Sequence, residues 1–404
     1  MNQSIQQLID AGRITAALGL QNTHSGNLSV RDGDVMLITR SGSMKGRLTP
    51  EDIVLVLLDE PDPRRFGAST EAGTHRRILL SAGAVIHAHA LHAILVAESC
   101  DVIVPVDWLG RRFLGHVPVA SFENPVGSAE MEEAIPRFLV DSPAVVVRTH
   151  GPFVRGNNLG EVMVRLSVLE ASAQTLWTLR LLGVAQPALT FLPDAGEIPD
   201  LFNSAGNGDP PPDFREAAAD LFRFRLSPAG TGTISVRTSR GFDLAPWASV
   251  PDGLPLLVQR EGIEPAGGDF IQILHREVYT QTGSGSVLLC HAPEVVVQSI
   301  LVHMSEERTF IPIDAEGKLL YPEVPVLPPD TDPAEMVRAA ARHKMVLIAG
   351  LGVLAVGSSL NETLHHVSSM RQMAILKTQT ELAARCGASD DTTSDPPQTR
   401  LHNA

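Results

Sequence analysis

The feature that most constrains the fold of this 404-residue chain is an internal repeat. SGNLSV at residues 25–30 is matched by TGTISV at 231–236, HAL at 89–91 by HAP at 291–293, and HGPFVRG at 150–156 by LGVLAVG at 351–357. The members of each pair lie about 200 residues apart, and their order is the same in both halves. This spacing predicts a tandem duplication in which the two halves fold alike.

The segment between the repeats is rich in Pro, Gly, Asp and Asn, which is typical of a linker. We therefore expect a first domain at residues 1–185, a linker at 186–214 and a second domain at 215–386. The polar residues 387–404 are expected to form a flexible tail.

Strand and helix patterns alternate within each half. In the first half, helices are expected at about residues 2–19, in the segment STEAGTHRRILLSAG, in LHAILVAES, and in a long terminal segment ended by Gly183. Strands are expected near 27–30, 34–39 and 53–58, in VIHAHA and at 144–149. Ser69 or Thr70 is expected to cap the second of these helices and Gly83 to end it. The predicted class is α/β, with two tandem three-layer α/β/α domains, each a central β-sheet flanked by helices.

Charge and composition exclude several classes of partner. The formal net charge is −14, which argues against binding to nucleic acid. No apolar run is long enough for a membrane span, so no membrane partner is expected. The three cysteines are scattered and the N-terminus lacks the pattern of a signal peptide. A cytoplasmic protein is therefore expected.

Three histidines interrupt the apolar run VIHAHALHAILV at residues 85–96. His87 and His89 are two residues apart, so on a strand they project from the same face, which suits two imidazoles on one metal ion. His92 lies on the following helix and is expected to support the site or the structure. His75 and His116 are expected at the surface or in a supporting position.

A third metal ligand must come from another segment of the chain. His150 is the best candidate because it follows a buried strand and directly precedes Gly151, and Asp101 and Asp107 are alternatives. Two buried imidazoles without a partner would be costly, so the pair favours a ligand role more than a lone histidine would, and simple packing stays the alternative.

Several ordered motifs over about residues 5–183 resemble the class II aldolase and adducin family, typified by zinc-dependent fuculose-phosphate and rhamnulose-phosphate aldolases. The motifs are SGNLSV, ITRSG at 38–42, LTPED at 48–52, STE followed by His75, HAH at 87–89, and THG at 149–151. The ordered set, rather than any one string, carries the resemblance.

The resemblance implies a role for each matching residue. His87, His89 and His150 would bind Zn²⁺, although imidazoles also suit other divalent transition metals. Glu71 would move a proton beside the metal. The substrate's phosphate would be bound by Asn27, Ser41, Gly42, Ser69 and Thr70. The implied enzyme is a lyase that cleaves or forms a C–C bond in a small, phosphorylated keto-sugar through a zinc-stabilised enediolate.

The sequence departs from the family at the general acid. The family's aldolases use a tyrosine, whereas the nearest position here is Phe122, and the only tyrosines are Tyr279 and Tyr321 in the second half. Other candidate donors are Glu123, His92, His116 or a tyrosine from the other half. The obvious cations of the phosphate site are limited to Arg40 and Lys45. A sugar-phosphate epimerase or dehydratase of the same family therefore stays open, as does a non-catalytic, adducin-like interaction module.

The second half keeps the fold signals and loses the chemistry. His291 matches His89, whereas the counterparts of His87, His150, Glu71 and Asn27 are Leu289, Leu351, Ile271 and Thr233. We expect no metal site there, with His291 packed at a strand end. Because the family assembles as fourfold rings with active sites between subunits, the resemblance implies a homo-oligomer. Two tandem chains would form a pseudo-tetramer.

Overall fold

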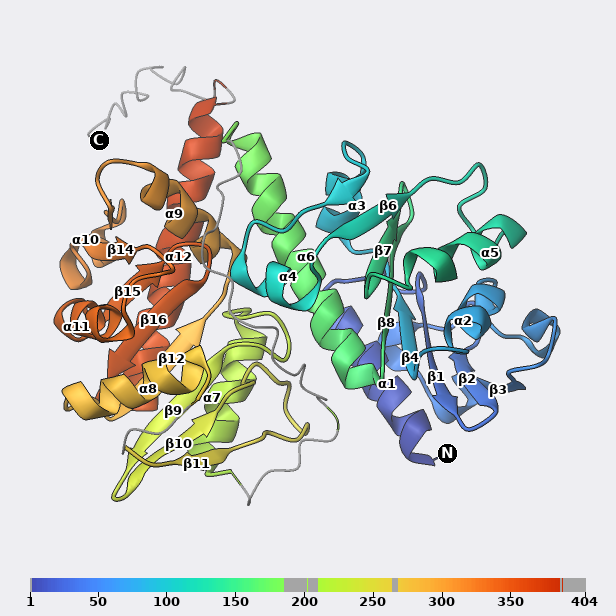
Figure 1. Ribbon diagram of the computed structural model, residues 1–404, viewed down its shortest axis with the longest axis horizontal. Helices are drawn as coiled ribbons and strands as arrows, with labels where there is room; N and C mark the ends of the chain where they lie inside the picture. The colour runs from blue at the N-terminus through green and yellow to red at the C-terminus, as the bar shows by residue number, and fades with distance from the viewer. Residues whose placement is uncertain (1, 185–201, 203–209, 264–267, 386, 388–404) are drawn as a thin grey trace, which may run out of the picture.

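The computed structural model describes residues 2–184, 202, 210–263, 268–385 and 387. Figure 1 shows two lobes side by side, the N-terminal one running from blue to green and the C-terminal one from yellow to red. Most of the expected linker at 186–214, and all of the expected tail at 387–404 except residue 387, lie outside these residues. Among the described helices, none is both long and apolar enough to cross a membrane.

The first lobe is built on an eight-stranded sheet with the strand order β3-β2-β1-β4-β8-β7-β6-β5. All neighbouring strands are antiparallel except β6 and β7, which are parallel. The elements are α1 Asn2–Ala17, β1 Asn27–Asp32, β2 Val35–Thr39, β3 Ile53–Leu57, α2 Ala72–Ile78, β4 Ala84–His87, α3 Leu91–Ala97, β5 Val102–Ile103, α4 Trp108–Phe113, β6 Val117–Ala120, α5 Ala129–Phe138, β7 Ala144–Val147, β8 Gly151–Gly156 and α6 Leu159–Leu181.

The second lobe repeats this topology with the strand order β11-β10-β9-β12-β16-β15-β14-β13. Its one parallel pair, β14 with β15, falls at the same place in the sheet. The elements are α7 Pro212–Arg223, β9 Thr233–Thr238, β10 Gly241–Ala245, β11 Gln259–Glu261, α8 Phe270–Gln281, β12 Ser286–Cys290, α9 Pro293–Met304, β13 Thr309–Phe310, α10 Ala315–Leu320, β14 Val324–Leu327, α11 Pro333–His343, β15 Met345–Ile348, β16 Gly352–Gly357 and α12 Leu360–Arg385. The two sheets confirm the predicted tandem α/β fold.

The sheet of the first lobe is buried on both faces, because alternate residues of its strands face opposite sides. Along β7, Val145 and Val147 join an apolar cluster with α2 and α5, whereas Ala144 and Val146 join a larger cluster with α1, α3 and α6. This larger cluster continues without a break into the second lobe. The two lobes therefore share one hydrophobic core across their junction.

Helices α6 and α9 pack together at the junction, and hydrogen bonds from other segments also cross it. The Ser167 hydroxyl on α6 donates a hydrogen bond to the Ala229 carbonyl oxygen at 3.0 Å. The backbone N–H of Trp108, at the start of α4, donates to the Gly350 carbonyl oxygen at 2.8 Å. Helix α4 of the first lobe thus reaches the turn between β15 and β16 of the second.

Helix α2 is shorter than the sequence patterns predict. It begins at Ala72 with Glu71 as N-cap and ends at Ile78, so neither the cap by Ser69 or Thr70 nor the end at Gly83 was correct. The Ser69 hydroxyl instead accepts a hydrogen bond from the Glu71 backbone N–H at 3.3 Å, one turn before the helix. The delayed start frees the Glu71 side chain to turn away from the helix.

A buried histidine occupies the same place in each lobe. Nδ1 of His75 lies 2.6 Å from the Ser29 hydroxyl, and Nδ1 of His275 lies 2.6 Å from the Ser235 hydroxyl. Nε2 of His275 also lies 2.6 Å from the Thr233 hydroxyl. Burial lowers the pKa of His75 to about 4 and that of His275 to about 3. Both rings are therefore neutral in the folded protein at neutral pH.

We expect the free energy of unfolding to fall as the pH drops below about 6.5, the ordinary value for histidine. The folded-state pKa of His275 lies below this value, so as the pH falls the unfolded chain takes up a proton at this histidine before the folded protein does. Acid therefore stabilises the unfolded state relative to the folded one. One such proton gives a slope of about 1.4 kcal/mol per pH unit. Denaturant titrations at several pH values should show a shallower slope for His275→Gln than for the parent. His365→Gln, at an exposed position on α12, should leave the slope unchanged. Equal slopes for the parent and His275→Gln would contradict this assignment.

Candidate functional site

The pairing of three strands brings distant residues to one edge of the first sheet. In the register of β1 with β4, Asn27 lies opposite His87, and in that of β4 with β8, His87 lies opposite Phe153. His89 follows two residues beyond the end of β4, and His150 lies in the tight turn between β7 and β8. The end of β4 and this turn therefore face each other.

The structure brings the side chains of His87, His89 and His150 together. One nitrogen atom of each ring lies within 4.8 Å of the other two. Ring centroids are 4.5 Å apart for His87 and His150, 5.0 Å for His87 and His89, and 4.9 Å for His89 and His150. Nitrogen atoms bound to one tetrahedral Zn²⁺ at about 2.1 Å are about 3.4 Å apart, so the rings would turn toward a common ion on binding it.

The two alternative ligands lie elsewhere. Asp107 caps α4, where its carboxylate accepts a hydrogen bond from the Gly110 N–H at 2.8 Å. Asp101 pairs with Arg148 at 3.0 Å on the surface. Neither carboxylate joins the histidine cluster.

The protonation of His87 suits a metal ligand. Nδ1–H donates a hydrogen bond to the Pro152 carbonyl oxygen at 3.0 Å, which leaves Nε2 as the free electron-pair donor. Nε2 is buried without a hydrogen-bond partner, with Oε2 of Glu71 3.4 Å away. Burial lowers the pKa of His87 to about 3, so the ring is neutral at neutral pH. This buried, orphaned nitrogen beside two further imidazoles fits a bound transition-metal ion.

Glu71 is a buried carboxylate beside the cluster, with a 3% exposed surface. Its Oε1 accepts a hydrogen bond from Nε2 of His150 at 2.9 Å, and its Oε2 accepts one from Nδ2 of Asn27 at 2.7 Å. Burial raises the pKa of Glu71, but the attraction of His87 and the hydrogen bonds from His150 and Asn27 outweigh burial and hold this pKa well below its usual range. The carboxylate is thus ionised and fixed in direction.

Backbone strain marks the turn that carries His150. Thr149 has a φ of 62°, in the left-handed region that a β-branched residue rarely adopts, whereas the second lobe has Gly350 with a φ of 71° at this place. Gly151 approaches the main chain so closely that a Cβ there would lie 2.2 Å from the Ala88 carbonyl oxygen. The Thr149 N–H donates to Oε1 of Glu98 at 3.0 Å. These contacts hold His150 against the segment of His89.

A pocket of about 280 Å³ opens beside the cluster. The five expected phosphate-binding residues and the two expected cations all line it: Asn27, Arg40, Ser41, Gly42, Lys45, Ser69 and Thr70. Glu71, His89 and His150 line it as well. His24, Ser25, Gly26 and Val126 also line the pocket, and sequence reasoning had assigned none of them a role. Ser25 and Gly26 belong to the SGNLSV motif, whereas His24 and Val126 carried no signal.

Lys45 forms part of the pocket wall from below the surface. Its Nζ donates hydrogen bonds to the carbonyl oxygens of Ser43 at 2.8 Å and His24 at 3.2 Å. Burial lowers the pKa of Lys45 to about 8, an effect that Asp52 partly offsets. A cation that ties two loops together therefore lies behind the neutral donors of the pocket.

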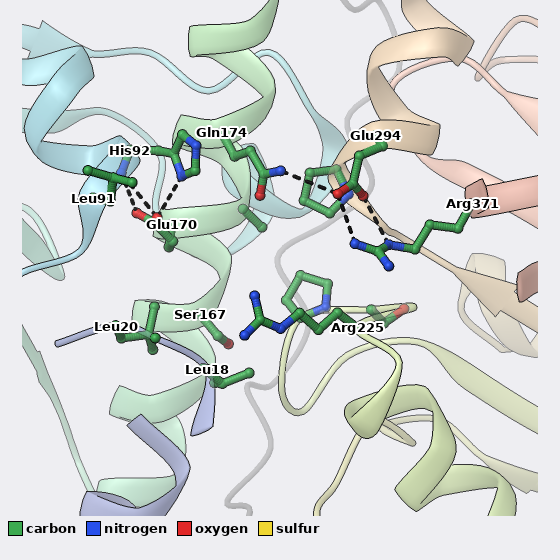
Figure 2. A pocket seen from close by; sticks show the side chains of 15 residues that line it. Leu18, Leu20, Leu91, His92, Ser167, Glu170, Gln174, Arg225, Glu294 and Arg371 are labelled. Atoms are coloured by element: carbon green, nitrogen blue, oxygen red, sulfur yellow. Dashed lines mark hydrogen bonds and ion pairs between the residues drawn. The ribbon is translucent and has the colours of Figure 1, made fainter. Parts of the chain in front are cut away.

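Several residues that sequence reasoning placed near the site lie elsewhere. His92 lines a pocket between the lobes and not the pocket beside the histidine cluster, and its Nδ1 lies 2.8 Å from Oε1 of Glu170 (Figure 2). His116 and Glu123 are exposed and do not line the pocket beside the histidine cluster. His75 is fully buried rather than at the surface.

None of the aromatic candidates supplies an acid at the pocket. Phe122 packs at the edge of the apolar cluster with α2 and α5. Tyr279 and Tyr321 are buried in the second lobe, within 2.8 Å of the Ser235 hydroxyl and 2.7 Å of Nδ1 of His366, respectively.

The corresponding place in the second lobe is filled. Leu289, Leu351 and Ile271 are buried, and Nδ1 of His291 donates to the Leu351 carbonyl oxygen at 2.8 Å. The indole of Trp108, from the first lobe, stacks on His291 with ring centroids 6.2 Å apart. Over the part of the chain that the structure describes, the first-lobe histidines are the only metal-type cluster found.

Comparisons with known proteins find one family in both lobes. The family described as class II aldolase and adducin N-terminal domain matches residues 6–177 and 271–377. A methylthioribulose-1-phosphate dehydratase of Bradyrhizobium sp. is 30% identical over 199 residues, which is 44% of this chain and 91% of that protein. A 5-methylthioribulose-1-phosphate/5-deoxyribulose-1-phosphate aldolase of Rhodospirillum rubrum is 30% identical over 207 residues, 50% of this chain and 91% of that one. The crystal structure of L-fuculose-1-phosphate aldolase from Thermus thermophilus is 34% identical, covers 47% of this chain and 100% of its own, and has a TM-score of 0.44.

We expect His89→Ala to abolish metal binding. Elemental analysis of the purified parent should give about one transition-metal ion per chain, and the variant close to none. His291→Ala, the matched change in the second lobe, should keep the parent's metal content. An equal loss in both variants, or no metal in the parent after incubation with Zn²⁺, would contradict the assignment.

Proposed function

We propose, from the premise that this chain belongs to the class II aldolase and adducin family, that it is a metal-dependent lyase acting on a small, phosphorylated keto-sugar. The observation that carries the proposal is the convergence of His87, His89 and His150 with the buried carboxylate of Glu71. A non-catalytic interaction module has no need of three imidazoles and an ionised carboxylate in one place.

The three histidines would hold Zn²⁺, the ion that best matches an all-imidazole set with an open position. When bound, the ion polarises a substrate carbonyl as a Lewis acid. The main-chain contact at Nδ1 of His87 orients that ring, and the strained turn at Thr149 positions His150. The fold thus fixes the ligand directions before a metal arrives.

Neutral donors and two cations are suited to bind the phosphate group. The hydroxyls of Ser41, Ser69 and Thr70 and the amide of Asn27 line one pocket, with Arg40 and Lys45 in its wall. Nδ2 of Asn27 lies 2.9 Å from the Ser69 hydroxyl and also reaches Glu71, so the phosphate donors and the carboxylate form one network. Substrate position and proton transfer are therefore coupled through Asn27.

Glu71 is the proton carrier in this proposal. In the cleavage direction, the carbon next to the carbonyl gains a proton after its bond to the aldehyde carbon breaks, and in the reverse direction the same carbon gives up a proton. Glu71 is ionised and held by Asn27 and His150, so it accepts the proton in the direction of C–C bond formation. The aldehyde oxygen requires a separate acid.

Dehydration is the second candidate reaction, and the missing acid favours it. Among the described residues that line the pocket, none is a tyrosine. Relatives at 30% identity include both a dehydratase and an aldolase. In a dehydration, Glu71 removes the proton next to the carbonyl, and the neighbouring carbon loses its hydroxyl group as water. Chromatography coupled to mass spectrometry of reactions with a panel of ketose phosphates separates the outcomes: two carbonyl fragments indicate cleavage, loss of one water indicates dehydration, and a new chromatographic peak with the mass of the substrate indicates epimerisation.

We expect Glu71→Gln to lower kcat by about 100-fold to 10,000-fold, because the amide cannot accept the proton. Metal content should stay at the parent's level, since the three histidines are retained. Glu123→Gln, at an exposed position that does not line the pocket, should keep full activity. A fully active Glu71→Gln variant with metal bound would exclude Glu71 as the proton carrier.

Helix α10 of the second lobe corresponds to helix α4, which packs at the lobe junction, but the surface of α10 is exposed. This exposed apolar surface supports an oligomer. Asp107 caps α4 and Asp314 caps α10 in the same manner. Arg112 and Leu319 lie the same number of positions after these aspartates, so they correspond to each other. Helix α4 contacts the second lobe at Trp108 and Arg112, whereas Leu319 on α10 is 80% exposed. Ile311 and Ile313, just before α10, are 44% and 41% exposed. We infer that two chains form a closed pseudo-fourfold ring in which α10 of each covers the first-lobe pocket of the other.

We expect the parent to be a dimer and Leu319→Asp to be a monomer by light scattering, because a charge on this apolar face opposes its burial. The monomer should lose activity, since its pocket stays uncovered. Leu80→Asp, at another apolar side chain that is 60% exposed, should remain dimeric. A fully active, monomeric parent would refute the ring without affecting the proposed reaction.

A further inference from the structure

A second polar pocket, of about 590 Å³, lies between α4, β8, α6 and the segment before β7. It shares no lining residue with the catalytic pocket. Four arginines line it, Arg111, Arg112, Arg155 and Arg165, against only two carboxylates, Asp141 and Glu161. In a chain with a formal net charge of −14, this is an unusual concentration of positive charge.

The arginines are only partly satisfied by the protein. Arg165 pairs with Oε1 of Glu161 at 2.7 Å and donates to the Arg155 carbonyl oxygen at 2.7 Å. Arg155 donates to the Val140 carbonyl oxygen at 3.1 Å, and Nε of Arg111 donates to the Pro105 carbonyl oxygen at 2.9 Å. The Nε atoms of Arg112, Arg155 and Arg165 are buried without a hydrogen-bond partner.

The environment of these side chains disfavours their positive charge. Burial lowers the pKa of Arg165, Glu161 opposes this effect, and the neighbouring Arg155 lowers the pKa further. Burial also lowers the pKa of Arg112. Glu161 pairs with Arg165, and the rings of Trp108 and Trp247 lie against Arg112, so these charges are compensated only in part. Because guanidinium groups remain charged in proteins, an anion in the pocket would offset the remaining cost of desolvation.

The fold itself does not require the arginines, because the second lobe is built without them. Asn157 N–H donates to Oε2 of Glu161 at 2.7 Å, and Ser358 N–H donates to Oε2 of Glu362 at 2.7 Å, so these two glutamates correspond. Counting from them, Arg165 corresponds to His366 and Arg155 to Val356.

The two capping aspartates of α4 and α10 likewise make Leu319 the counterpart of Arg112. The same architecture thus forms with a leucine, a valine and a histidine at these three places. The arginine cluster is specific to the first lobe.

We propose that this pocket binds a diphosphate group, either as free inorganic pyrophosphate or as the diphosphate of a nucleotide. Arginine forks match phosphate oxygens in geometry, and several guanidinium groups around one cavity suit an anion with more than one phosphate. The volume exceeds the need of a single phosphate, and Phe113, Leu114, Val140 and Pro143 give the pocket apolar walls. The site is separate from the catalytic pocket, so its occupancy does not depend on the proposed reaction.

Isothermal titration calorimetry of the full-length, metal-loaded protein tests the proposal with pyrophosphate and with adenosine diphosphate as probes. The test variants introduce the residues of the second lobe, Arg155→Val and Arg165→His. Each should weaken the affinity by about tenfold, because a charge-assisted hydrogen-bonding group is lost. Arg137→Gln, at an exposed arginine that pairs with Glu133 on α5, should bind as the parent does.

The two probes distinguish the source of the diphosphate. Equal affinities indicate free pyrophosphate, and tighter binding of adenosine diphosphate indicates a nucleotide. The variant His89→Ala separates this site from the catalytic pocket, since it should keep the parent's affinity for the probe. Absence of saturable binding at millimolar probe, unchanged affinity in both arginine variants, or loss of binding in His89→Ala would overturn the proposal.

Discussion

The antiparallel pairing of β4 with β8 is the constraint on which the first lobe's chemistry depends. It sets His87 opposite Phe153, and β8 begins directly after the turn that contains His150. A slip of one residue would turn the His87 side chain to the other face of the sheet and separate the two imidazoles. Valine and isoleucine on both faces make such a slip costly, because alternate residues of β4 and β7 belong to different apolar clusters. The polar site is thus positioned by apolar packing.

The repeats and the alternation of strand and helix patterns were sufficient to predict the tandem α/β fold. The residues alone named His150 as the best partner of His87 and His89, and the resemblance of the ordered motifs to a known family completed the trio that the structure brings together. The sequence could not show that α2 begins only after Glu71, since Ser69 and Thr70 are equally good capping residues by type. Nor could the sequence predict the direction of the His92 side chain, because its partner Glu170 lies far along the chain, on α6 (Figure 2). The arginines of the second pocket are likewise dispersed along the chain, and only tertiary structure gathers them.

The two lobes show which parts of this architecture belong to the fold and which to the chemistry. Both keep the same strand order, the buried histidine next to a serine, and the glycine that follows the β7–β8 or β15–β16 turn. The lobes differ at the positions where the first lobe has buried polar side chains that need hydrogen-bond partners. Where Ile271 replaces the carboxylate, the hydroxyl of Thr233 lies 2.6 Å from Nε2 of His275, whereas Nε2 of His75 in the first lobe has no hydrogen-bond partner. The silent lobe is therefore a repacked structure rather than a damaged one.

The stacking of Trp108 on His291 makes the divergence of the second lobe difficult to reverse. Restoring histidines at 289 and 351 would rebuild the donor set, yet the indole from the first lobe would still cover the ring of His291. Removing that indole would in turn open the shared core at the lobe junction. The place that corresponds to the histidine cluster thus serves the packing of the two lobes against each other in the second lobe.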